Sequence, residues 1–125
     1  MLVADDNELL REAIVKYVAD RFELVGAVSN GRELVEATLL HNPDVVVSDA
    51  SMPLLTGAGA LKLLRSSGQR VPFVLLTAEA CGARAWCELG MLAVVDKRDL
   101  YDELVAAVES AAAGTMYLSR HARER

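Results

Sequence analysis

The chain has 125 residues, 53% of them hydrophobic and 25% charged, and its 13 basic and 18 acidic residues give a net charge of −5 at pH 7. This length supports one domain with a substantial core, and this composition excludes a disordered chain. The negative charge, without a cluster of lysine and arginine, argues against a domain that binds nucleic acid by itself.

The start of the chain and its cysteines favour a cytoplasmic protein. Met1–Ala4 leads directly into Asp5 and Asp6, without the basic and apolar regions of a signal peptide. The longest apolar runs are about seven residues, whereas a membrane span needs about 20. One helix carrying both Cys81 and Cys87 would hold them too far apart for a disulfide, so we expect reduced thiols. We also expect no contact with a membrane.

Five short apolar runs recur along the chain. They are almost continuously apolar instead of alternating, which is typical of strands buried on both faces in a parallel sheet. The runs are Met1–Ala4, Glu23–Val28, Asp44–Val47, Pro72–Leu76 and Leu92–Val95.

Helical patterns lie between and after these runs. Apolar residues recur at helical spacing over Leu9–Val18, and a capping-box pattern at Asn30–Glu33 begins a second helix that Pro43 ends. Three further helices are predicted over Gly57–Gly68, Cys81–Leu89 and Asp99–Gly114. Five strands alternating with five helices predict an α/β fold, in which a five-stranded parallel sheet carries helices on both faces.

Polar residues follow four of the predicted strands, at the sheet edge where open α/β folds bind ligands. They are Asp5 and Asp6, Asp49, Thr77, and Lys97. Three carboxylates at one edge repel each other, and a Mg²⁺ ion with oxygen ligands would relieve that repulsion. A lysine ammonium and a threonine hydroxyl beside the carboxylates suit a site that holds a phosphoryl group.

In their order and spacing, Asp5-Asp6, Asp49-Ala-Ser-Met-Pro53, Thr77-Ala78 and Lys97 resemble the receiver domain of two-component response regulators. The resemblance covers essentially the whole chain. It implies the flavodoxin-like (βα)5 fold and a Mg²⁺-dependent signalling domain that is activated by phosphorylation.

The resemblance also implies a role for each site residue. Asp49 would accept the phosphoryl group and, with Asp6, bind Mg²⁺ directly. Asp5 would assist through water, and the backbone carbonyl of Ser51 would complete the protein's share of the ligands. Thr77 and Lys97 would contact the phosphoryl oxygens.

The end of the chain, with Val95–Asp99 and Gly114–Ser119, looks most like receivers of the NarL/FixJ subfamily, which are joined to a LuxR-type helix-turn-helix domain. We therefore expect residues 1–114 to form the receiver and residues 115–125 to begin a linker or tail, with the output domain absent. The implied partners are a sensor histidine kinase and a second copy bound through the first and fifth helices. Transcription would be controlled, and DNA bound, only through an attached or partner DNA-binding domain. The receiver would promote only its own phosphotransfer and dephosphorylation.

Three positions concern how such a receiver would work. Ser51 and Glu79 lie two residues beyond Asp49 and Thr77, and we expect them to line the approach of the hydrolytic water. Val94 stands where many receivers carry a tyrosine or phenylalanine whose ring reports phosphorylation. The stretch that ends at Gly90 is short for the family, so its helix is expected to be short or displaced.

Two other functions fit parts of the pattern. A receiver-like module could signal by binding alone, without phosphorylation. An aspartyl-phosphate phosphatase also uses an aspartate at a strand end, but Ser51 stands where that family has its second aspartate. Outside the site, Trp86 is expected in the core or on the surface of the fourth helix, and His121 is expected to be solvated.

Overall fold

The computed structural model describes residues 1–80 and 82–123. At its centre is a sheet of six parallel strands in the order β2-β1-β3-β4-β5-β6. The strands are β1 (Leu2–Ala4), β2 (Gly26–Val28), β3 (Val46–Asp49), β4 (Phe73–Thr77), β5 (Ala93–Asp96) and β6 (Tyr117–Leu118). The flavodoxin-like α/β fold is confirmed, with one strand more than the five predicted.

The helices alternate with the first five strands as predicted. They are α1 (Glu8–Val18), α2 (Gly31–His41), α3 (Gly57–Ser66), α4 (Ala83–Leu89), α5 (Leu100–Ala112) and α6 (Arg120–Arg123), with a 3-10 turn η1 (Lys97–Asp99) before α5. Over residues 1–80 and 82–123, none of them is long and apolar enough to cross a bilayer.

Side-chain caps fix where the first two helices begin. The Asn7 side chain accepts the N–H of Leu10 at 3.0 Å, and the Asn30 side chain accepts the N–H of Glu33 at 2.8 Å. The Glu33 carboxylate returns to the N–H of Ser29 at 3.0 Å, one residue before the cap. The predicted capping box is therefore present, with its return bond displaced by one position.

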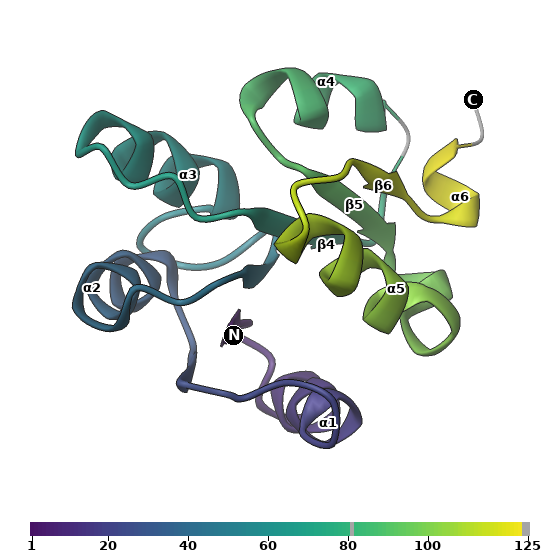
Figure 1. Ribbon diagram of the computed structural model, residues 1–125, viewed down its shortest axis with the longest axis horizontal. Coiled ribbons are helices and arrows are strands. Elements are labelled where there is room, and N and C mark those ends of the chain that lie inside the picture. Colours follow the sequence, from purple (N-terminus) through teal and green to yellow (C-terminus); the bar gives the residue numbers. More distant parts are fainter. Residues whose placement is uncertain (81, 124–125) are drawn as a thin grey trace.

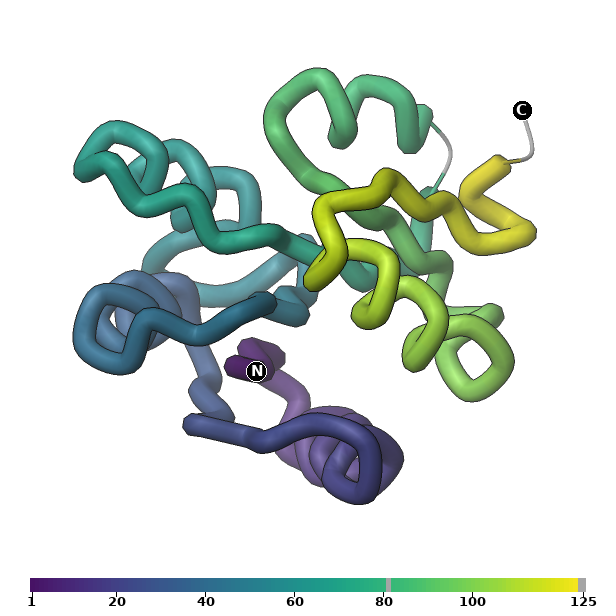
Figure 2. Tube along the Cα trace, in the orientation of Figure 1, coloured from purple at the N-terminus to yellow at the C-terminus, as the bar shows by residue number. Residues whose placement is uncertain are grey.

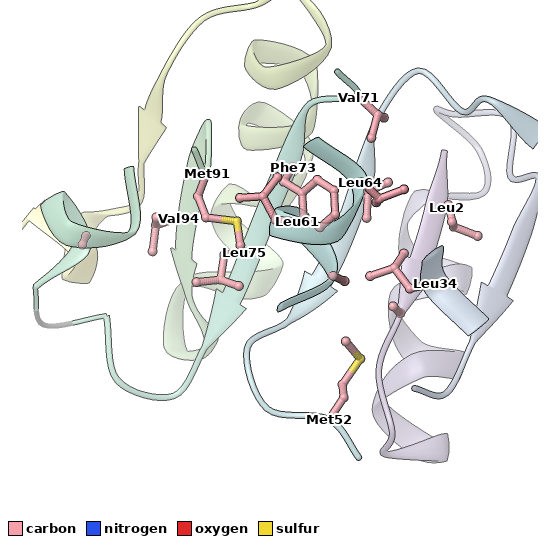
Figure 3. Close-up of a cluster of buried hydrophobic side chains, with 14 of the residues drawn as sticks. Leu2, Leu34, Met52, Leu61, Leu64, Val71, Phe73, Leu75, Met91 and Val94 are labelled. Atoms are coloured by element: carbon pink, nitrogen blue, oxygen red, sulfur yellow. The ribbon is translucent and has the colours of Figure 1, made fainter. Parts of the chain in front are cut away.

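The helices cover both faces of the sheet (Figure 1). On one face α2, α3 and α4 enclose a buried cluster that includes Leu34, Leu61 and Phe73, which Figure 3 shows meeting over the strands. On the other face α1 and α5 enclose a second cluster, with Ile14 and Leu104 fully buried. This burial on both sides explains why the strands are almost continuously apolar in sequence.

The fourth helix is short, as predicted, with seven residues. Gly82 before it and Gly90 after it have φ angles of 79° and 118°, a left-handed region that favours glycine. Cys87 lies on this helix as a free, half-buried thiol. The expectation for Cys81 lies outside the described residues.

Beyond α5 the chain turns at Gly114, whose φ is 82°, and runs back beside β5 (Figure 2). There β6 adds to the sheet edge, with Tyr117 opposite Ala93 and Leu118 opposite Val94. Two residues are too short a strand to show as a periodic pattern, which is why the sequence did not reveal β6.

His121, at the start of α6, was expected to be solvated, and that prediction was wrong. Its side chain is only 19% exposed, and its Nδ1 lies 2.6 Å from Oδ1 of Asp99. The partner is 22 residues away in sequence, so the local composition of the tail held no sign of it.

Candidate functional site

The three aspartates expected at the sheet edge lie together. Asp5 and Asp6 follow β1 directly, and Asp49 is the last residue of β3, the neighbouring strand. Each offers a carboxylate oxygen, and these oxygens all lie within 4.8 Å of one another. Asp5 and Asp49 are buried, while Asp6 is exposed. The order of the strands therefore creates the acidic cluster.

Asp5 has one carboxylate oxygen with a partner and one without. Its Oδ1 accepts the N–H of Asn7 at 2.9 Å, whereas Oδ2 is buried with no hydrogen bond in the described chain. Burial raises the pKa of Asp5, and the charge of Asp49 adds to that effect, against the N–H of Asn7 and the ammonium of Lys97. A buried carboxylate oxygen without a donor is poorly satisfied, so this site fits a cation with oxygen ligands.

Lys97 faces the phosphoacceptor candidate. Its Nζ lies 3.1 Å from Oδ1 of Asp49, and its side chain remains 32% exposed. Lys97 begins η1 just after β5, where the side chain of Asp96 accepts the N–H of Arg98 at 2.9 Å. This turn fixes the backbone from which the lysine reaches across β4 to β3.

Thr77, the last residue of β4, is buried, and its hydroxyl is hydrogen-bonded to the backbone of Glu79. It accepts the N–H of Glu79 at 3.1 Å and donates to the carbonyl of Glu79 at 3.2 Å. The hydroxyl is thus held by the loop after β4 in this state.

An open pocket of about 450 Å³ lies over Asp49. Its lining residues come from the ends of β3, β4 and β5 and from α4: Asp49, Ala50, Ser51, Thr77, Ala78, Glu79, Trp86 and Lys97. The sequence-predicted residues other than the Asp5-Asp6 pair therefore share this pocket, and that pair belongs to the adjoining acidic cluster.

Several contacts at the site were not apparent from sequence. Trp86 packs partly against the core, as expected, but it also lines the pocket. Arg11 donates to the backbone carbonyl of Asp5 at 2.8 Å and so holds the turn after β1. A Cβ on Gly57 would come within 2.8 Å of the carbonyl oxygen of Asp49, so glycine there lets α3 approach the end of β3 closely.

Residues 1–109 match the model of the response regulator receiver domain family. The chain therefore belongs to this family, as its resemblance implied, and is a receiver domain of the kind that serves two-component signalling.

Two relatives show the range of proteins that carry such a domain. A protein-glutamate methylesterase/protein-glutamine glutaminase of Archaeoglobus fulgidus is 35% identical over 96% of this chain and 38% of its own length. A nitrate/nitrite response regulator protein homolog of Haemophilus influenzae is 38% identical over 62% of this chain and 38% of its own length. The chain thus spans little more than a third of these relatives.

Solved structures agree with the fold. The signal receiver domain of the response regulator NarL of Mycobacterium tuberculosis is 28% identical, with a TM-score of 0.82 over 90% of this chain and 94% of that one. A LuxR-family response regulator of an Aurantimonas species superimposes with a TM-score of 0.88 over 97% of this chain and 89% of that one, at 24% identity. The first neighbour is consistent with a NarL-like receiver, and the second supports the fold.

Proposed function

We propose that the chain is a phosphorylation-activated signalling receiver that accepts a phosphoryl group on Asp49 from a phosphohistidine of a sensor histidine kinase. The single observation that carries this proposal is the Asp49 carboxylate itself. It is buried, and it lines an open pocket. One of its oxygens lies within 4.8 Å of oxygens of two further carboxylates, and a lysine ammonium lies 3.1 Å away.

The transfer is an in-line displacement at phosphorus. A carboxylate oxygen of Asp49 forms the new P–O bond while the P–N bond of the phosphohistidine breaks. The imidazole nitrogen leaves with the electron pair and takes up a proton. Lys97 offsets negative charge on the transferred group, because its ammonium already lies against the accepting carboxylate.

Asp6, Asp49 and the backbone carbonyl of Ser51 would hold Mg²⁺, with Asp5 assisting through water. The buried, unpartnered oxygen of Asp5 and the three converging carboxylates support this ligand set. When bound, Mg²⁺ supplies positive charge that offsets the charge of the equatorial phosphoryl oxygens. Asp6 is exposed, so a cation can reach the cluster from solvent.

Phosphorylation would change the surface formed by α4, β5 and α5. The new charge would attract the hydroxyl of Thr77 away from Glu79, to which it is now hydrogen-bonded, and would reorient Lys97. We propose that this change controls transcription through an attached or partner DNA-binding domain, since a chain of net charge −5 is poorly suited to bind DNA alone. Pairing of two copies through α1 and α5 is part of the same proposal, because both helices lie on one face of the sheet.

The test is to incubate the protein with a small phosphodonor and Mg²⁺ and to measure its intact mass. The proposal predicts a gain of one phosphoryl group that disappears in Asp49→Asn and when Mg²⁺ is chelated. No gain at any Mg²⁺ concentration would favour the alternative, a receiver-like module that signals by binding alone. The buried Val94, which has no ring to report phosphorylation, is the observation that keeps this alternative in view.

A further inference from the structure

Trp86 occupies a place in the pocket that no part of the proposed phosphotransfer uses. It lies on α4, and it lines the pocket over Asp49 together with Lys97. Among the lining residues it is the one aromatic side chain, and it is the single tryptophan of the sequence. The indole is half-buried, with one part packed against the core cluster beneath α4.

The rest of the pocket mouth is small or polar. Ser51 and Glu79 are exposed, and the other loop positions in the lining are the alanines Ala50 and Ala78. None of these side chains presents a large apolar surface that would keep water out of the pocket on the side of α4. The indole of Trp86 is therefore the principal apolar surface beside the phosphoacceptor.

The backbone holds this side chain in place. The carbonyl of Trp86 accepts the N–H of Met91 at 3.1 Å, closing the helix at Gly90. Ala83, one turn before Trp86, is buried, and Met91 after the helix is also buried in the same cluster. The short helix is thus anchored at both ends, with the indole between the core and the pocket.

We propose that the Trp86 indole shields the phosphoaspartate from water on the α4 side and so prolongs the phosphorylated state. The proposal rests on the proposed function. In hydrolysis, a water oxygen attacks phosphorus, the P–O bond to Asp49 breaks, the carboxylate leaves with the electron pair, and the water proton passes to solvent. An indole has a donor N–H and no acceptor, so it cannot take that proton and acts only by occupying space.

The test measures how long the phosphoryl group stays on the protein. Wild type, Trp86→Ala and Trp86→Phe are phosphorylated with a small phosphodonor and Mg²⁺, the donor is removed, and the decay is followed by intact mass. Trp86→Ala should decay on the order of fivefold faster, and Trp86→Phe, which keeps a ring, should stay within about twofold of wild type. Leu89→Ala is the matched control, since Leu89 lies on the same helix, is 45% exposed and does not line the pocket.

Thermal unfolding of each variant separates loss of the fold from loss of shielding. If Trp86→Ala does not fold, iodide quenching of the wild-type tryptophan fluorescence takes the place of the decay comparison. All tryptophan emission comes from Trp86. Quenching should fall on phosphorylation, because the phosphoryl group then fills the pocket that the indole lines. The shielding role alone is overturned if wild type is phosphorylated on Asp49 but folded Trp86→Ala loses the phosphoryl group at the wild-type rate. If Trp86→Ala does not fold, quenching of wild type that phosphorylation leaves unchanged overturns it in the same way. A wild-type protein that takes up no phosphoryl group overturns the proposed function, and the shielding role with it.

Discussion

The hydroxyl of Ser119 donates a hydrogen bond of 2.7 Å to the carboxylate of Asp99, 20 residues earlier in the chain. The same hydroxyl accepts the N–H of Asp96 at 2.9 Å, and Asp99 also receives the N–H of His121 at 2.9 Å. Asp99 and Ser119 are both buried. Together these bonds tie the segment after α5 to the end of β5 and to the start of α5, next to Lys97.

Removing the Asp99 carboxylate should therefore loosen the C-terminal segment. Asp99→Ala leaves the buried Ser119 hydroxyl without its acceptor and is expected to cost about 1–3 kcal/mol in free energy of unfolding. Amide hydrogen exchange at residues 117–123 should accelerate more than exchange in β1 and β3. Asp102→Ala, which changes an exposed aspartate in the first turn of α5, is the control. Unchanged exchange at 117–123 in Asp99→Ala would show that other contacts hold the segment.

Stability against acid should depend on Asp96. Hydrogen bonds from Arg98 lower the pKa of Asp96 from 3.8 to about 2, although burial acts in the opposite direction. A lowered folded-state pKa gives stability that is present above the unfolded value and is lost as the pH falls through the folded one. Asp96 should thus contribute at most about 2 kcal/mol, lost between about pH 4 and pH 2.

Urea unfolding of wild type and Asp96→Asn across this range measures that contribution. The difference in free energy of unfolding between the two proteins should shrink as the pH falls. Protonation of Asp96 removes from wild type the stabilisation by the charged carboxylate, which the variant lacks at every pH. A difference that stays constant down to pH 2 would contradict the assignment.

The Asp5 charge in the acidic cluster should lower the stability of the metal-free protein and strengthen the binding of Mg²⁺. Since burial raises the pKa of Asp5, its charge disfavours folding at neutral pH in the absence of a cation. Asp5→Asn keeps an acceptor for the N–H of Asn7, so we expect a higher melting temperature without Mg²⁺ and a smaller rise when Mg²⁺ is added. Asp20→Asn, at an exposed position in the turn after α1, should leave both values unchanged. A full Mg²⁺ response in Asp5→Asn would argue against its part in the metal site.

The aromatic residue that many receivers carry before the lysine should not fit here. Val94 is fully buried, paired with Leu75 on β4 and Leu118 on β6. Figure 3 shows it in the buried cluster near Met91. Val94→Phe is expected to lose about 1–3 kcal/mol of stability by overpacking, measured by urea unfolding. Met116→Phe, at a 58% exposed position, is the control, and equal stability of the two variants would contradict this account.

The sequence was sufficient for the features that depend on strong local patterns. Strands β1, β3, β4 and β5 are buried along their whole length, and the site residues stand at or just after their ends. The apolar runs therefore predicted both the sheet and the convergence of Asp6, Asp49 and Lys97. Strand β6 and the Asp99 contacts were missed because they depend on pairing between residues about 20 positions apart, with no periodic signal.

The role of Trp86 escaped prediction for a different reason. A tryptophan on a helix face is expected to pack in the core, and Trp86 does so in part. Only the length and placement of α4 determine that the remaining part of the indole borders the pocket over Asp49. That placement depends on the two glycines that bound the helix.

The most direct measurement of the central claim is the position of the phosphoryl group. After incubation with a small phosphodonor and Mg²⁺, borohydride reduction would convert a phosphorylated aspartate to homoserine, which peptide mass spectrometry can locate. We predict homoserine at position 49 alone, at a level that falls sharply in Lys97→Met. Homoserine at another carboxylate, or none in a protein that binds Mg²⁺, would contradict it.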